Sequence, residues 1–168
     1  MNETTLTHEG AKLTIERVIN APKDKVWDAY TTADLFVKWF SPQGWSAHTK
    51  HFDVSTDGYV LYAMKCEDET QTDWFGKETW GKSVYSSVTP KDTFTYRDFF
   101  CDEEGNPTGG MPVSETRISF TETDGKTKIT SVSTYESEAA VEQVLAMGME
   151  EGIKQTFDKL ALVLEQAN

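Results

Sequence analysis

The 168-residue sequence is poor in cysteine and in basic residues, and both shortages narrow the classes of protein to which it can belong. Its two cysteines, Cys66 and Cys101, are far apart, and a chain of this length can bury enough surface to fold without disulfides. We therefore expect free thiols, as in a reducing cytoplasm. Lysine and arginine number 16 against 28 acidic residues, a net charge of −12 that repels nucleic acid and anionic membranes.

Long apolar runs are also missing. No stretch approaches the roughly 20 apolar residues that span a bilayer, and residues 1–5 have neither the basic region nor the apolar core of a secretion signal. We expect a cytoplasmic protein with no membrane partner and no nucleic acid partner.

The spacing of a metal site or of a catalytic motif is absent as well. His48 and His51 are three residues apart in a predicted strand, which places them on opposite faces, so they could share an ion only across a bulge. The acidic stretches 67–69 and 102–104 lack the spacing of calcium ligands. No Gly-x-Ser-x-Gly motif and no Gly-rich phosphate loop occurs. We predict no metal, no cofactor and no nucleophilic catalytic residue.

Two hydrophobic periods divide the chain. After a polar segment at 1–10 that we expect to fray, a strand at 12–19 and two short helices at 23–32 and 34–39 are predicted. Between residues 45 and 135, six short alternating segments broken by turn signals indicate an antiparallel sheet. From Ser137 onward, steps of three or four predict one amphipathic helix that lies across the sheet, with apolar positions Val141, Leu145, Met149, Ile153, Phe157, Leu160 and Leu164. The expected class is α+β.

Gly148 and Gly152 lie one turn apart within this predicted helix. Each costs about 1 kcal/mol of helix stability relative to alanine, so their presence needs a reason, and room for a ligand beneath the helix is one candidate.

Aromatic residues make up 12% of the chain and are the main candidates for a binding site. For any single ring, simple filling of the core is the better interpretation. Collectively, however, Tyr62 and Met64 share a strand face with Val60, and Tyr96 shares one with Phe94, so several rings are expected to point under the helix. Tyrosine and tryptophan need hydrogen-bond partners when buried, which favours an apolar cavity with a few polar groups.

Several segments, in this order and spacing, carry a family resemblance: Ile19-Asn20-Ala21-Pro22, Val26-Trp27-Asp28-Ala29-Tyr30, Trp39-Phe40-Ser41-Pro42, Trp80-Gly81 and Met149-Glu150-Glu151-Gly152. Over residues 11–166 the chain resembles START-like (Bet v 1-like) helix-grip domains, in particular the family named for the activator of the Hsp90 ATPase. The resemblance implies one domain, with a curved antiparallel sheet of about seven strands around the C-terminal helix and a cavity between them. Many members have tryptophan where this chain has Ile153, which implies a larger pocket or an altered mouth.

The residues that we expect to bind a ligand combine strand rings with residues of the last helix: Trp39, Trp45, Tyr62, Met64, Trp80, Tyr85, Tyr96, Met149, Gly152, Ile153 and Phe157. Among the tryptophans, Trp39, Trp45 and Trp80 are expected nearest the cavity. The first hypothesis is a binding protein for an apolar or aromatic small molecule. An enzyme of the cyclase or hydro-lyase kind, with Tyr62, Tyr96 or Asp98 in acid–base roles, is the alternative. A chaperone-interaction module is a third, by family analogy.

Overall fold

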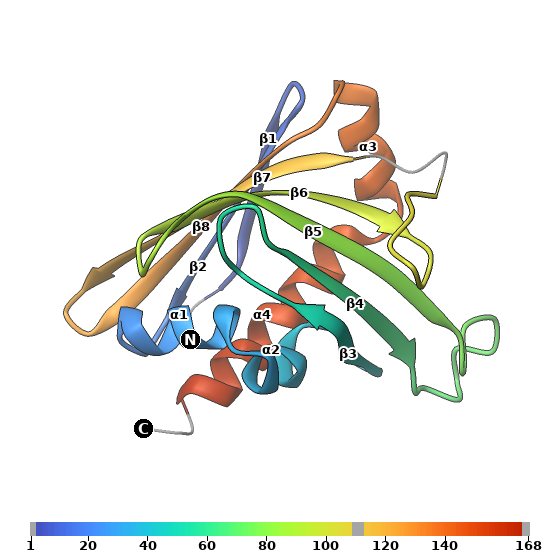
Figure 1. Ribbon diagram of the computed structural model, residues 1–168, viewed down its shortest axis with the longest axis horizontal. Helices are drawn as coiled ribbons and strands as arrows, with labels where there is room; N and C mark the ends of the chain where they lie inside the picture. The colour runs from blue at the N-terminus through green and yellow to red at the C-terminus, as the bar shows by residue number, and fades with distance from the viewer. Residues whose placement is uncertain (1–2, 109–112, 166–168) are drawn as a thin grey trace.

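The computed structural model describes residues 3–108 and 113–165, and their strands form one curved antiparallel sheet (Figure 1). The eight strands are β1 (Thr5–Glu9), β2 (Lys12–Ile19), β3 (Trp45–Phe52), β4 (Tyr59–Cys66), β5 (Glu78–Thr89), β6 (Thr93–Cys101), β7 (Ser114–Thr123) and β8 (Lys126–Thr134). Their order is β1-β2-β8-β7-β6-β5-β4-β3. Strands β3 to β8 thus follow one another as hairpins, and β2 joins this meander at β8.

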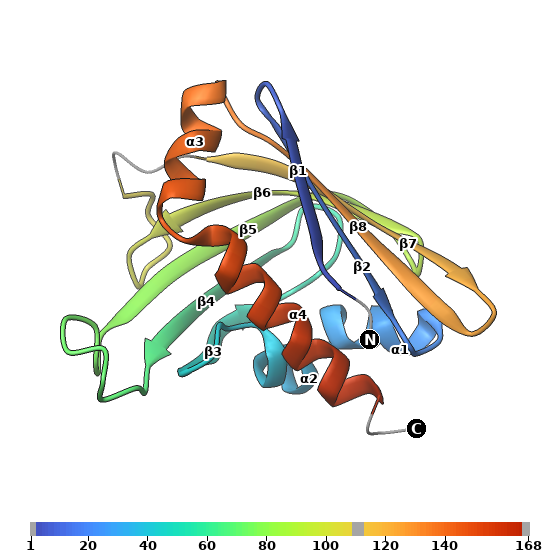
Figure 2. The ribbon, with the colours of Figure 1, turned by 180° about the vertical axis from the view of Figure 1, so that it is seen from behind.

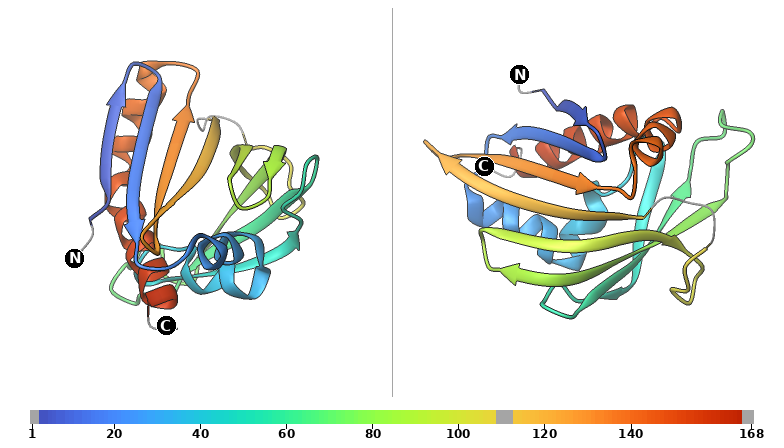
Figure 3. Two further views of the ribbon diagram at one scale, coloured as in Figure 1. Left: turned by 90° about the vertical axis from the view of Figure 1, so that its left-hand side faces the viewer. Right: turned by 90° about the horizontal axis from the view of Figure 1, so that it is seen from above.

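Four helices accompany the sheet: α1 (Lys23–Thr31), α2 (Ala33–Trp39), α3 (Glu138–Ala146) and α4 (Met149–Glu165). The first two carry the chain from β2 to the edge strand β3, and α4 crosses the inner side of the curved sheet (Figures 2 and 3). The predicted α+β class and helix-grip arrangement are confirmed.

The expectation of a frayed segment at residues 1–10 is wrong for its described part. Thr5–Glu9 forms the edge strand β1, which pairs with β2 in the register Leu6↔Ile15 after a turn at Gly10. The sheet therefore has one strand more than the seven expected. The alternation rule missed β1 because this edge strand buries little of its surface and so carries no apolar period.

The predicted single C-terminal helix is also wrong, because it is divided at Gly148. Ser137 caps the start of α3 by accepting a hydrogen bond from the Ala140 amide at 3.1 Å, as the sequence indicates. Gly148 has φ +85°, and its amide donates to the Leu145 carbonyl, which ends α3. A residue in the left-handed conformation just after a helix is most often glycine, so the backbone at this break explains why position 148 is a glycine. The apolar period continues across the break and conceals it.

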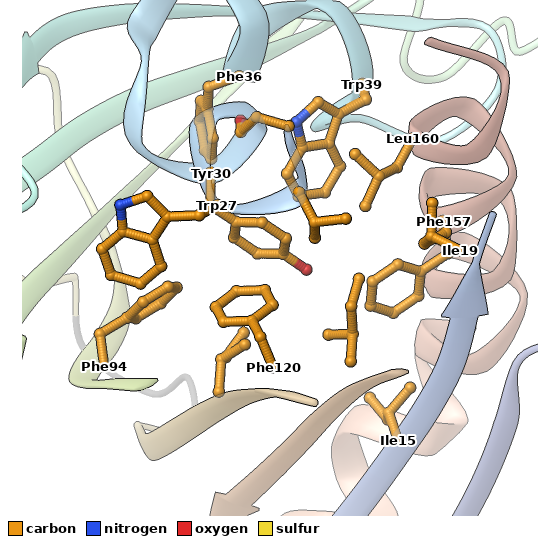
Figure 4. Packing of buried hydrophobic residues seen from close by; sticks show 14 of the residues in the cluster. Ile15, Ile19, Trp27, Tyr30, Phe36, Trp39, Phe94, Phe120, Phe157 and Leu160 are labelled. Atoms are coloured by element: carbon orange, nitrogen blue, oxygen red, sulfur yellow. The ribbon is translucent and has the colours of Figure 1, made fainter. Parts of the chain in front are cut away.

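Rings from α1 and α2 meet rings from the sheet at one end of the interior (Figure 4). Tyr30 lies 4.7 Å from Trp39 and 5.2 Å from Phe120 between ring centroids, and Trp27 packs edge-on against Phe94. The Trp39 indole donates to the Ala29 carbonyl at 2.9 Å, so its buried N–H is satisfied. This aromatic cluster closes one end of the space between sheet and helix.

Helix α4 is fixed to the rest of the fold through its second half. Its buried side chains are Phe157, Leu160, Ala161 and Leu164, and all of them lie in the last nine residues of the helix. The side chains of residues 149–156 are instead partly or fully exposed. The first half of α4 therefore does not pack tightly onto the sheet.

Two neighbouring charged residues hold this second half from opposite sides. On one side, the buried Arg17 of β2 donates to Asp158 at 2.7 Å and to Thr4 at 3.2 Å. On the other side, the Lys159 ammonium bridges to the segment after α2, donating to Ser41 Oγ and to the carbonyls of Pro42 and Trp45 at 3.0–3.2 Å. The position of α4 relative to the sheet is thus set near residues 158 and 159.

A pair of glycine substitutions tests the helix break. An added Cβ would meet open space at both Gly148 and Gly152, so the two alanine variants differ in backbone conformation alone. Gly148→Ala should destabilise the protein by roughly 1–2 kcal/mol because φ is positive there, whereas Gly152→Ala should stabilise it by up to about 1 kcal/mol. Urea unfolding of the two variants measures both, and equal shifts of the same sign would contradict a break at Gly148.

Candidate ligand-binding cavity

A cavity of about 520 Å³ lies beneath the loosely packed first half of α4. On the helix side, its wall is formed by side chains and backbone around the α3–α4 junction: Val144, Met147, Gly148, Met149, Gly152, Ile153, Thr156 and Phe157. Because an added Cβ at Gly152 would meet nothing within 4 Å, this glycine leaves free space inside the helix wall.

The mouth of the cavity is marked by lining residues that are also exposed to solvent. Met147, between α3 and α4, is 54% exposed, and Phe100, near the end of β6, is 40% exposed. The cavity therefore opens between the helix junction and the end of β6.

The structure brings most of the predicted site residues to the cavity. Those that line it are Trp39, Trp45, Met64, Tyr96, Met149, Gly152, Ile153 and Phe157. Tyr62 and Tyr85 lie in the buried core next to this lining rather than in it, with Tyr85 5.6 Å from Phe94 between ring centroids.

Trp80 lies on the other face of the sheet. It pairs with Ala63 in β4, and its ring meets His48 edge-on at 5.5 Å. Its neighbours Gly81, Ser83 and Tyr85 are buried at alternating positions of β5, which leaves Trp80 on the outside. The expectation that Trp80 lies near the cavity is therefore wrong, and β5 brings Thr79 there instead.

Asp98 on β6 is the one charged side chain in the cavity wall among the described residues. Its Oδ2 accepts a hydrogen bond from Ser83 at 2.8 Å, and the Tyr62 hydroxyl lies 3.2 Å from both carboxylate oxygens. Burial raises the pKa of this carboxyl to about 6, although the two hydrogen bonds oppose the shift. Burial and the nearby Asp98 charge raise the pKa of Tyr62, so its phenol stays a neutral donor.

Gly81 makes the contact between Tyr62 and Asp98 possible. Tyr62 on β4 pairs with Gly81 on β5, and its ring lies flat across that position, because a Cβ on Gly81 would sit 2.5 Å from the ring and the hydroxyl. The phenol thereby reaches over one whole strand to β6. Any side chain at position 81 would push Tyr62 away from the carboxylate.

A row of hydroxyl groups continues the polar part of the wall across β7 and β8. Thr116 and Ser133 face each other in register, with their oxygens 2.7 Å apart, and Ser114 and Ser131 are also buried on this face. Burial raises the pKa values of Tyr96 and Tyr135. Hydrogen bonds from Thr116 to Tyr96 and from Ser114 to Tyr135 oppose this rise. The cavity thus has an apolar helix wall and a sheet wall with one carboxylate and several hydroxyls.

These hydroxyl residues are absent from the residues predicted to bind a ligand. Their signal is the alternation of small hydroxyl residues, Ser114-x-Thr116 and Ser131-x-Ser133, at positions where a packed sheet would carry larger apolar groups. Phe100 and Met147 at the mouth are also absent from the predicted site residues, because strand and helix ends have no periodic signal.

The two histidines lie on the same face, contrary to expectation, because a bulge falls between Thr49 and His51. His48 pairs with Ala63 and His51 with Leu61, two alternate positions of β4. His48 lies 3.3 Å from Glu78, while His51 stacks on Tyr59. Within the described ranges, no three His, Cys, Asp or Glu side chains gather as metal ligands would. Both cysteines are free and buried.

This fold, with a curved sheet, a long helix across it and a cavity between them, is that of START-like helix-grip domains. Residues 20–165 match the family described as activator of Hsp90 ATPase homolog 1-like protein, and the chain belongs to this family. The family and the fold are those of small ligand-binding domains with an aromatic-rich interior. No helix in the described part of the chain is long and apolar enough to cross a membrane.

Solved structures support the assignment. The crystal structure of protein Ms6760 from Mycobacterium smegmatis is 31% identical, with a TM-score of 0.85 over 96% of both chains. A solution structure from Staphylococcus epidermidis is 30% identical, with a TM-score of 0.82 over 98% of this chain and 95% of the other. A solution structure of a protein from Arthrobacter aurescens shares the fold at 22% identity, with a TM-score of 0.86 over 96% of this chain and 91% of the other. No curated protein is significantly similar to this chain.

The raised pKa of Asp98 predicts a specific loss of stability with rising pH. Between the unfolded value near 3.8 and the folded value of about 6, the folded state binds the proton more tightly. The stabilisation is therefore fully present below pH 4 and is lost as pH rises through 6, by about 3 kcal/mol in all. Asp98→Asn lacks a group that titrates and should not show this loss.

Urea unfolding of the wild type and of Asp98→Asn at several pH values between 4 and 7.5 measures the difference directly. The exposed Glu115→Gln variant, on the outer side of the sheet, is the control for a change in net charge and should follow the wild type. Parallel stability curves for the wild type and Asp98→Asn would show that Asp98 titrates normally.

Proposed function

We propose that this protein binds an apolar or aromatic small molecule in the cavity beneath α4. The observation that carries the proposal is the cavity itself. Its volume of about 520 Å³ falls within the range of roughly 300–1,000 Å³ that is typical of ligand sites. Its lining combines apolar helix residues with many aromatic residues: Tyr30, Trp39, Phe40, Trp45, Tyr96, Phe100, Tyr135 and Phe157.

A space of this size is not a packing defect. Protein interiors are close-packed and hold few voids larger than a water molecule. Because the mouth is open, water fills the space in the free protein. Displacement of that water by apolar surface would favour binding.

Tryptophan fluorescence offers a direct test, since Trp39 and Trp45 both line the cavity. Flat aromatic compounds and fatty acids should be titrated, and we expect at least one class to quench emission saturably at concentrations below a millimolar. Native mass spectrometry of freshly purified protein would identify a ligand that copurifies. If every class fails in both measurements, the proposal is contradicted.

A leucine at Gly152 tests whether binding occurs in this cavity. Its side chain would enter the free space next to Gly152, so ligand affinity should fall by about tenfold or more while the fold persists. Glu151→Leu adds the same side chain at an exposed position of α4 and should leave the affinity unchanged. Unchanged affinity in Gly152→Leu, together with a raised melting temperature, would place the binding elsewhere.

One observation favours an enzyme as the second candidate. A carboxyl with a pKa of about 6 could exchange a proton with a bound molecule near neutral pH, while the neutral phenol at 3.2 Å donates a hydrogen bond. In that case Asp98→Asn would retain binding of a copurified molecule but would no longer convert it, which product analysis by mass spectrometry can follow. A cytoplasmic location and contact with a chaperone stay predictions.

A further inference from the structure

We propose that the ligand of this cavity is an aromatic or apolar molecule that carries a protonated nitrogen, and that this group pairs with Asp98. The inference rests on the proposed binding function and specifies the chemistry of the ligand. Its basis is that no other charged side chain lies beside Asp98 in the described part of the wall.

Asp98 has two hydrogen-bond donors but no cationic partner. Ser83 and Tyr62 contact its oxygens, and both groups are neutral. The lining contains no lysine, arginine or histidine within the described ranges. Two hydroxyl groups therefore compensate the charge of Asp98 only in part, and water in the cavity supplies the remaining solvation.

A ligand that fills the cavity removes this water. A purely apolar ligand would leave the carboxylate buried against hydrocarbon, which is unfavourable, and a ligand carboxylate would add repulsion between like charges. A protonated amine reverses both effects, because it forms a charge-assisted hydrogen bond in a medium of low dielectric constant. The wall thus discriminates between ligands by the charge of their polar group.

Two further features favour a cation. Tyr96 lies two residues before Asp98 and Phe100 two residues after it, on the same side of β6, so aromatic rings flank the carboxylate along the strand. Aromatic faces attract organic cations. The net charge of −12 also raises the concentration of cations around the protein.

Three probes with one skeleton test the proposal: 2-(2-naphthyl)ethylamine, 2-(2-naphthyl)ethanol and 2-naphthylacetate. Their affinities should be measured by calorimetry at pH 7.5 and low salt. We expect the amine to bind about tenfold more tightly than the alcohol, and the carboxylate to bind more weakly than both. An amine no tighter than the alcohol, with the alcohol bound, would overturn the inference and leave the proposed function standing. Failure of all three to bind would overturn both.

Substitution of Asp98 assigns the preference to this residue. Asp98→Asn should bind the amine and the alcohol with equal affinity, and the retained affinity for the alcohol shows that the variant is folded. Glu115→Gln, which changes the net charge equally on the outer side of the sheet, should keep the full preference for the amine. A preference that survives in Asp98→Asn would contradict the pairing.

The pH dependence supplies a second readout. The alkylamine stays protonated between pH 5 and 8, so its affinity should fall below pH 6 as Asp98 takes up a proton, by up to tenfold per pH unit, whereas affinity for the alcohol should stay constant. The titratable groups whose pKa values the Asp98 charge helps to raise stay neutral in this range: Tyr62 of β4, Tyr85 of β5, Tyr96 and Cys101 of β6, and Tyr135 after β8. A flat profile for the amine would contradict the proposal.

Discussion

The attachment of α4 through its second half is the constraint on which the rest of this structure depends. Phe157, Leu160 and Leu164 pack into the core, and Asp158 and Lys159 tie the helix to β2 on one side and to the segment after α2 on the other. The first half of α4 then extends over the inner side of the sheet without tight packing. The cavity exists because the helix is held at one end and the aromatic cluster of α1 and α2 fills that same end.

The chemistry of the cavity depends on a contact across three strands. Tyr62 on β4 reaches Asp98 on β6 because Gly81 on β5 has no side chain. The contact gives a partly buried carboxylate a donor without giving it a positive charge. Among the described residues of the wall, Asp98 is the one charged group, and its electrostatic requirement is not met by a cation. This requirement makes the cavity selective rather than merely apolar.

The sequence predicts the fold class because alternation from residue 45 to 135 and the helical period after Ser137 are both strong. It does not predict β1, which buries too little to carry a period, nor the break at Gly148, since the apolar stripe runs on through it. In the site, residues on the regular faces of β4, β6 and α4 could be predicted. Trp80 could not, because which face of a strand turns inward depends on pairing with neighbours, and the row of hydroxyls became meaningful only once β7 and β8 were in register.

The central claim is that the space beneath α4 receives a ligand, and methionine-methyl NMR tests it most directly. Of the five methionines in the chain, Met64, Met147 and Met149 line the cavity, on the sheet, at the mouth and on the helix wall. A bound aromatic ligand should shift these three assigned methyl resonances together through the ring current of the ligand. A ligand that binds saturably but leaves all three unshifted would contradict the claim.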